Sequence, residues 1–561
     1  MDHIPTETPN EKSTSFLSGV FLLTLSTTLV KVMGLLTKIP MLRLLGAQGM
    51  GYYNAAYEVY AALFVLSTAG LPVALSILVS RAEQGRRRIF RRAMGLFAFV
   101  GGVGSLGLWA FADALATRIG NPGAGDSMRA LAPAVLFVCL ASGVKGYYQG
   151  LGDMRPTAIS QVLESVGKLA FGLMLAARAR RIGAPLSRVA AAGALGLSMA
   201  TLLALIYLLL CMRSKFDRRG QKNGDCINGA SAVEKTVYRV LRPLCAIAVP
   251  ITLSAGVTPL TRVLDMVLIL RRLQDCGQSA EITGELYGIY STLAIPLYSL
   301  LPMLIGSLAL PLVPGITRAR QMGDTAGERE IVGLSLRLTL LLGLPASMGL
   351  SVFARPVLML LFGGGGTEAV MTAEPLLRVL AISIPGGCLV TVLGAMLQAY
   401  GCQRVPLGAM LAGSSVKLIS AYILLGMPRI GMLGAPISTF LCHLTVIVIE
   451  ASVLNKRIPQ GITLRTLGGG MLAASVLSIG TVWVLWLGVM RLCTPPRAAI
   501  LPAVMLCAGL YLCLTLRMGA LRREDMLSLP GGERLWRLCV RAGLVRVGKS
   551  RENYRKKGVN F

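Results

Sequence analysis

Long apolar segments separated by short polar connections dominate the chain. A helix of about 20 mainly apolar residues crosses the hydrocarbon core of a bilayer, and the sequence contains about 14 segments of that kind. Their approximate positions are 16–39, 52–80, 88–112, 127–150, 156–177, 189–212, 243–270, 286–316, 331–354, 374–400, 405–426, 433–454, 466–490 and 498–517. The pattern predicts an all-α integral membrane protein with about 14 transmembrane helices.

Composition supports this prediction and excludes an ordinary soluble domain. Of the 561 residues, 54% are hydrophobic and 15% are charged, and the mean hydropathy is +0.66. The leader carries Asp2, Glu7 and Glu11 against a single Lys12, so it lacks the basic region of a cleaved signal peptide. We expect the first helix to be retained.

A repeat relates two distant parts of the chain. Residues Arg129 to Leu169 match residues Arg378 to Leu418 without a gap at a spacing of 249, with 11 identities in 41 aligned positions. The polar identities in or beside apolar segments include Gln149 with Gln398, Arg155 with Arg404, Ser165 with Ser414 and Lys168 with Lys417. Two copies of one helix bundle are typical of a transporter whose site lies between the copies.

The distribution of Lys and Arg among the connections predicts the orientation in the membrane. Cations gather in the even-numbered connections, at residues 81–92, 213–242, 318–320 and 456–457. The other side is poorer in cations, with residues 178–188 as the exception. The positive-inside rule therefore places both termini in the cytoplasm.

The net charge of +30 does not by itself indicate nucleic-acid binding. The cations lie in short loops and in the tail after Arg517, which is the ordinary signature of membrane orientation. The tail either lies on anionic membrane lipids or is simply solvated. We expect no nucleic-acid partner.

No motif for catalysis, a cofactor or a metal emerges. None of the 12 cysteines forms a CxxC pair, and the two histidines, His3 and His443, cannot build a zinc site or a triad. The run Gly363 to Gly366 is followed by Thr367 and Glu368 instead of the Lys and Ser/Thr of a Walker motif. We expect no enzyme, no cofactor and no metal, and transport driven by a gradient, the membrane potential or the substrate's own downhill movement.

Ionisable residues inside the apolar segments are the candidates for function. Each costs about 2.5 to 3.5 kcal/mol at mid-membrane and must face a cavity, a partner or the interface. Lys31 and Lys38 are seven residues apart and share one face of the first helix. Glu164 and Lys168 are four apart and can pair along their helix, which leaves open whether they bind a ligand or only hold helices together.

The later segments contain further candidates. Arg262 and Asp265 are three residues apart and can also pair. Lys417 has Gly413 where its repeat mate Lys168 has a carboxylate, which makes Lys417 the better candidate for ligand binding. The cations predicted to line one positive cavity, suited to phosphate or pyrophosphate, are Lys31, Lys38, Lys168, Arg262 and Lys417.

A carboxylate and several helix breakers complete the candidates. Glu58, near Tyr53, Tyr57 and Tyr60, either balances the cavity charge, binds a coupling cation or lies at the interface. Glu164 and Asp265 are the other candidates for coupling or charge balance. Gly70, Pro72, Pro296 and Pro302 interrupt the helical hydrogen bonds, where they would serve either as hinges for a rocking motion or as packing kinks.

Three stretches of sequence together carry a family resemblance. They are Lys31-Val-Met-Gly34 with Arg43-Leu-Leu-Gly46-Ala-Gln-Gly49-Met-Gly51-Tyr-Tyr53 and Gly70-Leu-Pro72-Val-Ala74-Leu-Ser76; Gly146-Tyr-Tyr-Gln149-Gly150-Leu-Gly152-Asp-Met-Arg155-Pro156-Thr-Ala-Ile-Ser-Gln161; and Asp265 with Arg271-Arg272-Leu273 and Gly277. Over about residues 16 to 520 the chain resembles the stage V sporulation protein B and polysaccharide biosynthesis protein group. That group belongs to the multidrug, oligosaccharidyl-lipid and polysaccharide (MOP) exporter superfamily, which includes the MurJ lipid II flippases.

The resemblance implies two pseudo-symmetric six-helix lobes, two additional C-terminal helices and alternating access. In MurJ-like proteins an essential arginine stands where this chain has Lys31, and an Arg-Asp pair stands where it has Thr37 and Lys38. The lost carboxylate predicts a different substrate geometry. Helices 466–490 and 498–517 match the pair that forms a lipid-tail groove in MurJ-like proteins.

The expected organisation follows from the segments, the repeat and the resemblance. It comprises a cytoplasmic leader (1–15), an N-terminal lobe (16–213), a basic inter-lobe loop (214–242), a C-terminal lobe (243–455), two additional transmembrane helices (456–518) and a basic cytoplasmic tail (519–561).

The resemblance and the cationic segments together predict a flippase of the bacterial plasma membrane. Its cargo would be a polyprenyl-pyrophosphate-linked saccharide, with lipid II first and another cell-wall or spore polysaccharide precursor second. Its partners would be this lipid, membrane lipids, a coupling cation or the membrane potential, and cell-wall synthesis proteins. The alternatives are an ion-coupled multidrug antiporter of the same fold, which would need an acidic cavity, and a non-transporting scaffold that recruits cell-wall enzymes through the basic tail.

Overall fold

The computed structural model is helical throughout the part of the chain that it describes. That part comprises residues 9–82, 85–220, 232–309, 311–457, 464–492, 499–518 and 533. Within these ranges the elements are α-helices, short 3-10 helices and one π-helix, with no strand. The predicted all-α fold is confirmed.

The chain divides into two compact units, and each is described by itself. Unit 1 comprises Met1–Thr292, Gly364–Ala369 and Leu418–Ala435, and unit 2 comprises Leu293–Gly363, Val370–Lys417 and Pro436–Phe561. The helices of unit 1 are α1 (Pro9–Thr68), α2 (Leu71–Arg81), α3 (Arg86–Ala110), α4 (Ala112–Ile119), η1 (Pro122–Ala124), α5 (Gly125–Gly150), α6 (Arg155–Arg181), α7 (Leu186–Gly220), α8 (Ala232–Asp275), α9 (Ala280–Ile289) and η4 (Gly431–Leu433). The π-helix η2 (Tyr290–Ala294) contains the boundary between the units.

Unit 2 contains the remaining helices. They are α10 (Ile295–Ala309), α11 (Leu312–Gln321), α12 (Thr325–Val352), α13 (Ala354–Phe362), η3 (Gly363–Gly365), α14 (Thr367–Ala381), α15 (Ile384–Ala399), α16 (Arg404–Leu425), α17 (Gly434–Asn455), α18 (Leu464–Leu492) and α19 (Ile500–Arg517). The ends of α14, α16 and α17 that fall in 364–369 and 418–435 belong to unit 1.

The helices that could span a membrane match the predicted segments, with one difference in number. Twelve helices in the described residues are long and apolar enough, or up to 13 if the bent pair Thr367–Ala381 and Ile384–Ala399 is one span. The sequence predicts about 14 because segments 16–39 and 52–80 count separately. Met33–Arg81 is counted here as a single candidate span, although the kink at Gly46 divides this stretch into two helical segments.

A glycine explains how so long a helix changes direction. Gly46 lies inside α1 with φ 68° and ψ −179°, a conformation that interrupts the helix and that other residues rarely adopt. At 49 residues, Met33–Arg81 exceeds the roughly 20 that one crossing needs. The α1 backbone is therefore continuous in sequence but kinked at Gly46.

Small residues bring α1 and α9 into close contact. A Cβ atom added to Gly51 would lie 2.1 Å from the Gly284 carbonyl oxygen, and one added to Gly288 would lie 2.1 Å from the Ala47 carbonyl oxygen. Both pairs, Ala47 with Gly51 and Gly284 with Gly288, have the four-residue spacing by which membrane helices pack backbone to backbone.

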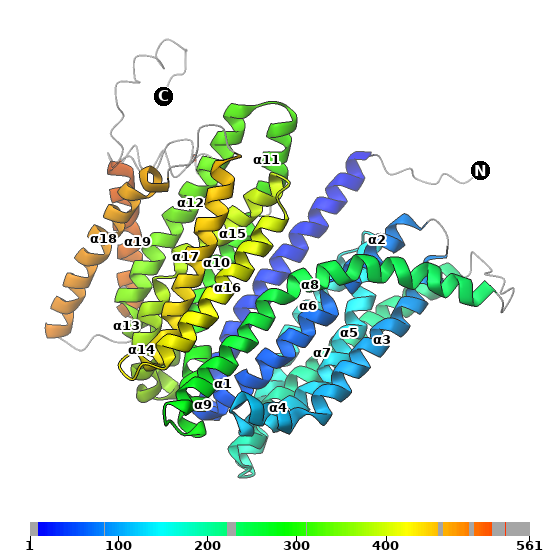
Figure 1. Ribbon diagram of the computed structural model, residues 1–561, viewed down its shortest axis with the longest axis horizontal. Coiled ribbons are helices and arrows are strands. Elements are labelled where there is room, and N and C mark those ends of the chain that lie inside the picture. Colours follow the sequence, from blue (N-terminus) through cyan, green and yellow to red (C-terminus); the bar gives the residue numbers. More distant parts are fainter. Residues whose placement is uncertain are drawn as a thin grey trace. The chain divides into compact units, whose positions relative to one another are not determined.

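The apolar core of unit 1 lies among α2, α3, α5, α7 and α8. Its largest fully buried members include Leu75, Phe97, Tyr148 and Leu208. Figure 1 shows α3, α5 and α7 alongside one another in this unit. Exposed apolar side chains lie on the outer faces, for example Phe99 and Leu106 of α3, as expected for helices that face lipid.

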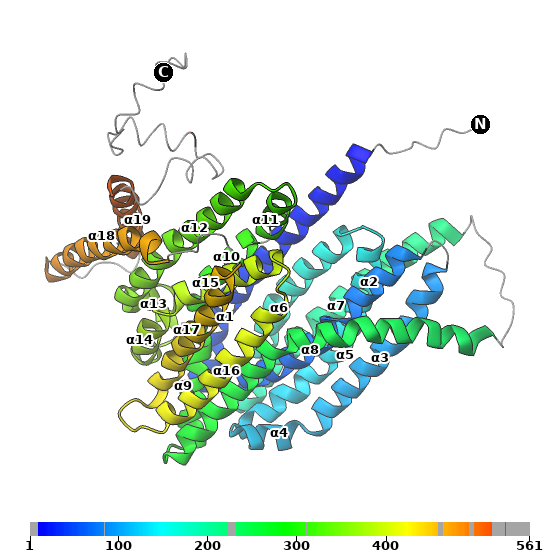
Figure 2. The ribbon, with the colours of Figure 1, turned by 45° about the horizontal axis from the view of Figure 1, so that its top comes forward.

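The last two helices lie side by side at one edge of unit 2, as Figure 1 and Figure 2 both show. Ile479, Val482 and Trp486 of α18 and Ile500 of α19 form a cluster with Phe353, the residue just before α13. The ring of Phe353 meets that of Trp483 edge to face, with centroids 5.3 Å apart.

The turn geometry of the repeat recurs in the structure. Gly152, between α5 and α6, and Gly401, between α15 and α16, both have φ 77°. Arg155 begins α6 and Arg404 begins α16. The two aligned segments therefore share one local structure, a helix, a left-handed glycine and a second helix.

The predicted lobe boundaries stay a prediction. Along the sequence, the main boundary between the two compact units falls between residues 292 and 293. The predicted boundary between the lobes lies instead in the loop 214–242. Residues 221–231 of that loop lie outside the described residues, as do the first eight residues of the leader and, apart from residue 533, the tail after residue 518.

Candidate functional site

A charged cavity lies among the helices of unit 1. It has a volume of about 380 Å³ and is formed by α1, α5, α6 and α7. Its lining residues are Val30, Gly34, Thr37, Tyr57, Tyr60, Ala61, Phe64, Lys145, Gln161, Glu164, Ser165, Lys168 and Leu197. We call it the cationic cavity, because the charged residues in its described lining are two lysines and one glutamate.

Lys168 is held in this cavity by aromatic rings. Its ammonium nitrogen lies 4.4 Å from the centroid of the Tyr57 ring, which is a cation–π contact between α6 and α1. Tyr57 stacks on Tyr53 at 6.3 Å and meets Tyr60 at 6.0 Å. The ring holds the ammonium without neutralising it, so the positive charge is available to an anion.

Glu164 forms an ion pair with Lys145 of α5. The Lys145 ammonium nitrogen and a Glu164 carboxylate oxygen are 3.7 Å apart, and the two side chains are 17% and 21% exposed. The sequence predicted a pairing of Glu164 with Lys168 along one helix. Lys145 was missed, although it is an ionisable residue in an apolar segment and the same rule would have identified it.

Lys38 is anchored to the π-helix. Its ammonium donates a hydrogen bond of 2.7 Å to the Ser291 carbonyl oxygen. The side-chain amide of Asn54, also on α1, donates to the Ser291 hydroxyl at 2.9 Å and to the Thr292 hydroxyl at 2.7 Å. A π-helix disturbs the regular backbone hydrogen bonds, and these α1 side chains satisfy polar groups there.

The remaining charged candidates of unit 1 lie near one another but do not line the cationic cavity. Lys38 is within electrostatic range of Glu58 and Lys168. Glu58, Asp265 and Arg262 are each within range of Tyr287 on α9. Asp265 is 7% exposed, whereas Arg262 is exposed at the surface of α8.

Lys31 and Lys417 are the two predicted cations that remain. Lys31 is helical in α1, but its side chain lies outside the described residues. Lys417 belongs to unit 2, is half-buried, lies within electrostatic range of His443 and is engaged by a neighbour, so it is not the isolated cation that the sequence suggested.

The hinge candidates lie at a close helix contact or where the helical backbone is interrupted. A Cβ on Gly70 would lie 2.1 Å from the Ala248 carbonyl oxygen, so the break between α1 and α2 packs directly on α8. Pro72 is the second residue of α2, and Pro296 follows the π-helix as the second residue of α10. Pro302 lies inside α10. A hinge role for these residues stays a prediction.

No three His, Cys, Asp or Glu side chains of the described ranges come together in an arrangement that could hold a metal ion. The groups that the structure gathers in unit 1 are instead ammonium, carboxylate, amide and aromatic groups. Such a cavity can bind an anionic and hydroxyl-bearing molecule through charge-assisted hydrogen bonds.

Solved structures with similar folds are membrane transporters. The lipid II flippase MurJ in an inward closed conformation matches with a TM-score of 0.65 and 13% identity, covering 88% of this chain and 98% of that one. An inward-facing multidrug resistance MATE family transporter of the MOP superfamily matches with a TM-score of 0.59 and 15% identity, covering 76% and 94%. The chain thus shares the fold of these multi-pass membrane transporters.

Family models agree with this class. The model of polysaccharide biosynthesis proteins matches residues 16–319, which is more than half of the chain, and the MatE model matches residues 291–423. The chain belongs to the polysaccharide biosynthesis protein family. It is a membrane transporter and not an enzyme, as the sequence predicted.

Curated relatives share most of the chain's length. Stage V sporulation protein B of Bacillus subtilis (strain 168) is 26% identical over 462 residues, which are 80% of this chain and 86% of that protein. The lipid II flippase MurJ of the same organism is 23% identical over 550 residues, which are 92% and 98%. The resemblance noted in the sequence is confirmed.

Proposed function

We propose that the chain is a flippase that carries a polyprenyl-pyrophosphate-linked saccharide across the bacterial plasma membrane by alternating access. The observation that supports this most is the cationic cavity, in which two ammonium groups and one carboxylate lie among membrane helices. A diphosphate would receive charge-assisted hydrogen bonds from Lys168 and Lys145. A cationic drug would meet ammonium groups of its own sign.

The other lining groups suit the part of the substrate next to the diphosphate. Gln161 and Ser165 can exchange hydrogen bonds with sugar hydroxyl groups, and Tyr57, Tyr60 and Phe64 supply an aromatic wall. A volume of about 380 Å³ fits a diphosphate with its first sugar and not an isoprenoid chain as well. We infer that the isoprenoid stays in the lipid, with the outer faces of α18 and α19 as its candidate position.

Lipid II is the first candidate for the cargo. MurJ, which is named as a lipid II flippase, aligns with 92% of this chain, and a named sporulation protein aligns with 80%. A second cell-wall or spore polysaccharide precursor linked to the same diphosphate would satisfy the same cavity. Lys31, Lys38, Arg262 and Lys417 stay candidates for later stages of the same path, outside the described lining of the cavity.

The binding step can be tested with the purified full-length chain. We expect a short-chain polyprenyl pyrophosphate to bind, and Lys168→Ala to weaken binding by about tenfold or more, since a hydrogen bond to a charged group contributes about 1.5 to 3 kcal/mol. Lys456→Ala, which removes an exposed lysine at the end of α17, is the matched control. Equal binding by the wild type and Lys168→Ala would contradict the proposed site.

A multidrug antiporter is the second candidate, because the MATE fold is similar and unit 2 contains a cavity with a carboxylate and no cation in its described lining. Expression of the chain in an efflux-deficient host distinguishes the two. A flippase leaves the resistance to lipophilic cations unchanged, whereas an antiporter raises it.

A further inference from the structure

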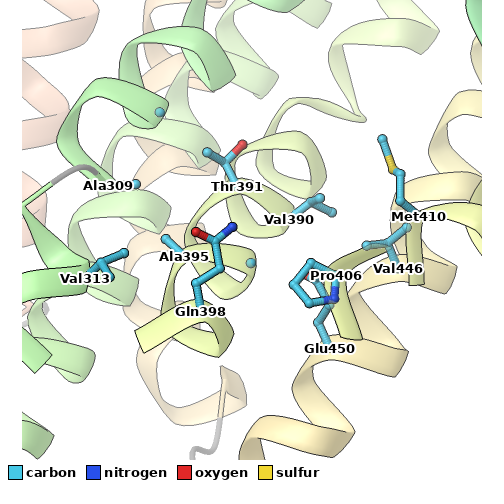
Figure 3. Close-up of a pocket in the computed structure, with 12 residues that line it drawn as sticks. Ala309, Val313, Val390, Thr391, Ala395, Gln398, Pro406, Met410, Val446 and Glu450 are labelled. Atoms are coloured by element: carbon cyan, nitrogen blue, oxygen red, sulfur yellow. The ribbon is translucent and has the colours of Figure 1, made fainter. Parts of the chain in front are cut away.

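A second cavity lies within unit 2, and its position follows from the repeat. Figure 3 shows side chains of α15, α16 and α17 around it, and α10 and α11 complete its wall. Its volume is also about 380 Å³. The lining residues are Gly306, Ala309, Val313, Val390, Thr391, Gly394, Ala395, Gln398, Pro406, Met410, Val446 and Glu450.

The two cavities occupy equivalent places in the two repeats. Six lining residues of the cationic cavity have partners in the second cavity at the repeat spacing of 249. These pairs are Tyr57 with Gly306, Tyr60 with Ala309, Phe64 with Val313, Lys145 with Gly394, Gln161 with Met410, and Leu197 with Val446. The last pair shows that the spacing continues from the aligned segments into α7 and α17.

The charges of the two cavities differ. The ion pair of the cationic cavity has no counterpart, because Gly394 stands in place of Lys145 and Gly413 in place of Glu164. Glu450 of α17 is the one charged residue in the described lining of the second cavity. We call it the acidic cavity.

Glu450 is deeply buried. Its side chain is 1% exposed, and its Oε2 atom makes no hydrogen bond within the described structure. A Cβ on Gly394 would lie 3.7 Å from Glu450 Oε1. The carboxylate therefore approaches the backbone of α15 at the position where the first repeat places an ammonium group.

Other titratable groups near this part of unit 2 do not line the cavity. They are His443 on α17, Lys417 and Arg404 on α16, Cys388 on α15, Tyr298 on α10, and Arg318 and Arg320 on α11. His443 lies two turns before Glu450, and its Nε2 atom is 3.2 Å from the Tyr298 hydroxyl oxygen. The lining contributed by α10 and α11 is Gly306, Ala309 and Val313, which carry no charge.

We propose that Glu450 is a proton-exchange site of the acidic cavity. A buried carboxylate without a cationic partner is strongly unfavourable when ionised, so it takes up a proton and becomes a neutral carboxylic acid. Water that enters the cavity accepts this proton, and the carboxylate is restored. The side-chain oxygens that could surround a metal cation are few, namely those of Glu450, Gln398 and Thr391, and the Thr391 hydroxyl already donates to the Gly387 carbonyl oxygen.

This site is distinct from the cationic cavity and goes beyond the proposed function. The proposal concerns the protonation of Glu450 in the acidic cavity. It does not depend on which molecule the protein carries. Ion coupling in a transporter requires such a group, whose charge changes as its access to water changes.

Infrared difference spectroscopy of the full-length protein in lipid nanodiscs tests the proposal. We expect a pH jump to change the C=O stretch of a protonated carboxyl group in the wild type, and Glu450→Gln to abolish that band. Glu374→Gln is the matched control, because Glu374 pairs with Arg378 at 2.7 Å on α14 and should remain ionised. A monodisperse elution profile shows that each variant is folded.

A repeat-guided substitution provides the second arm. Gly394→Lys places the ammonium of the first repeat opposite Glu450 and should also remove the band, because the ion pair keeps the carboxylate ionised. Retention of the full band in Glu450→Gln would overturn the proposal. A change of the band on addition of sodium at fixed pH would also overturn the proposal, because it would indicate that Glu450 belongs to a metal-cation site. Lipid translocation is not measured, so an error in the flippase assignment does not affect the result.

Discussion

Lys168 illustrates how a single side chain can carry charge inside a membrane protein and still be available to a ligand. Its ammonium is held by the Tyr57 ring at 4.4 Å, whereas Lys145 is held by the Glu164 carboxylate at 3.7 Å. An aromatic face stabilises a cation without cancelling its charge. Lys168 therefore supplies the net positive charge of the cationic cavity, and Lys145 chiefly balances Glu164.

The ion pair can be tested with a double-mutant cycle. Lys145→Ala leaves Glu164 as an uncompensated carboxylate next to Lys168, so we expect the affinity for a polyprenyl pyrophosphate to fall about tenfold or more. The double variant Lys145→Ala with Glu164→Gln removes both charges and should recover most of that loss. Binding is measured by titration of the purified variants. Equal losses in the single and double variants would show that the pair does not set the cavity charge.

Residue-level prediction from the sequence was partly successful. The cost of charge in hydrocarbon directed attention to Glu164 and Lys168, and the structure places both in one cavity wall. Lys145 and Glu450 obey the same rule, but neither has a charged residue three or four positions away in its own helix within the described chain, and such a pair is what marks Glu164 and Lys168 in the sequence. The ion pair of Lys145 with a carboxylate of another helix, and the burial of Glu450 without a charged neighbour in the described lining of its cavity, follow only from the packing.

At the scale of elements, α1 organises unit 1. It packs backbone to backbone on α9 through Gly51, Gly284 and Gly288, and it reaches the π-helix through Lys38 and Asn54. The sequence predicts two helices for this region, and the structure has two helical segments that join at the kink at Gly46. The sequence could not show that no loop separates them, because the polar and small residues there resemble a loop.

The contact between α1 and α9 predicts a sharp sensitivity to one methyl group. Gly51→Ala should destabilise the protein by several kcal/mol, because the added Cβ would lie 2.1 Å from a backbone carbonyl oxygen and the helices would have to separate. Gly102→Ala is the control, since a Cβ there meets nothing within 4 Å. We expect the apparent melting temperature in detergent to fall for Gly51→Ala only. Two equal melting temperatures would contradict the packing.

For the whole molecule, the distribution of cations predicts the orientation. The connection between α8 and α9 should lie outside the cell by the positive-inside rule. It contains Cys276, which is exposed and free. Cys493, between segments 466–490 and 498–517, should lie outside by the same rule, so the test starts from Cys493→Ser. We expect a membrane-impermeant thiol reagent to label intact cells that express Cys493→Ser but not those that express Cys276→Ser together with Cys493→Ser. Labelling that requires cell lysis would reverse the predicted orientation.

The basic tail distinguishes a transporter from a scaffold. Deletion of residues 522–561 removes 11 of the 56 Lys and Arg residues but no transmembrane segment of the described chain. A flippase should retain its transport after this deletion. A scaffold that recruits cell-wall enzymes through the tail should lose its function, as complementation of a depleted strain would show.

The sequence repeat also relates the two cavities of the molecule. One helix, turn and helix structure occurs twice, and the described linings of the two equivalent cavities differ in their ionisable residues, with two lysines and one glutamate in the first and one glutamate in the second. The sequence alone revealed the repeat through identities such as Gln149 with Gln398. The sequence alone did not show the difference in ionisable residues between the cavities, because this difference depends on Lys145 and Glu450. The spacing of 249 pairs these two residues with Gly394 and Thr201, which carry no charge.

The most direct test of the proposed function is the leaflet in which lipid II accumulates when the protein is depleted. We expect undecaprenyl-linked disaccharide-pentapeptide to remain on the cytoplasmic leaflet in depleted cells. Wild-type protein and Lys456→Ala should restore its translocation, and Lys168→Ala should not. Normal translocation in depleted cells lacking other flippases, or full rescue by Lys168→Ala, would contradict the account.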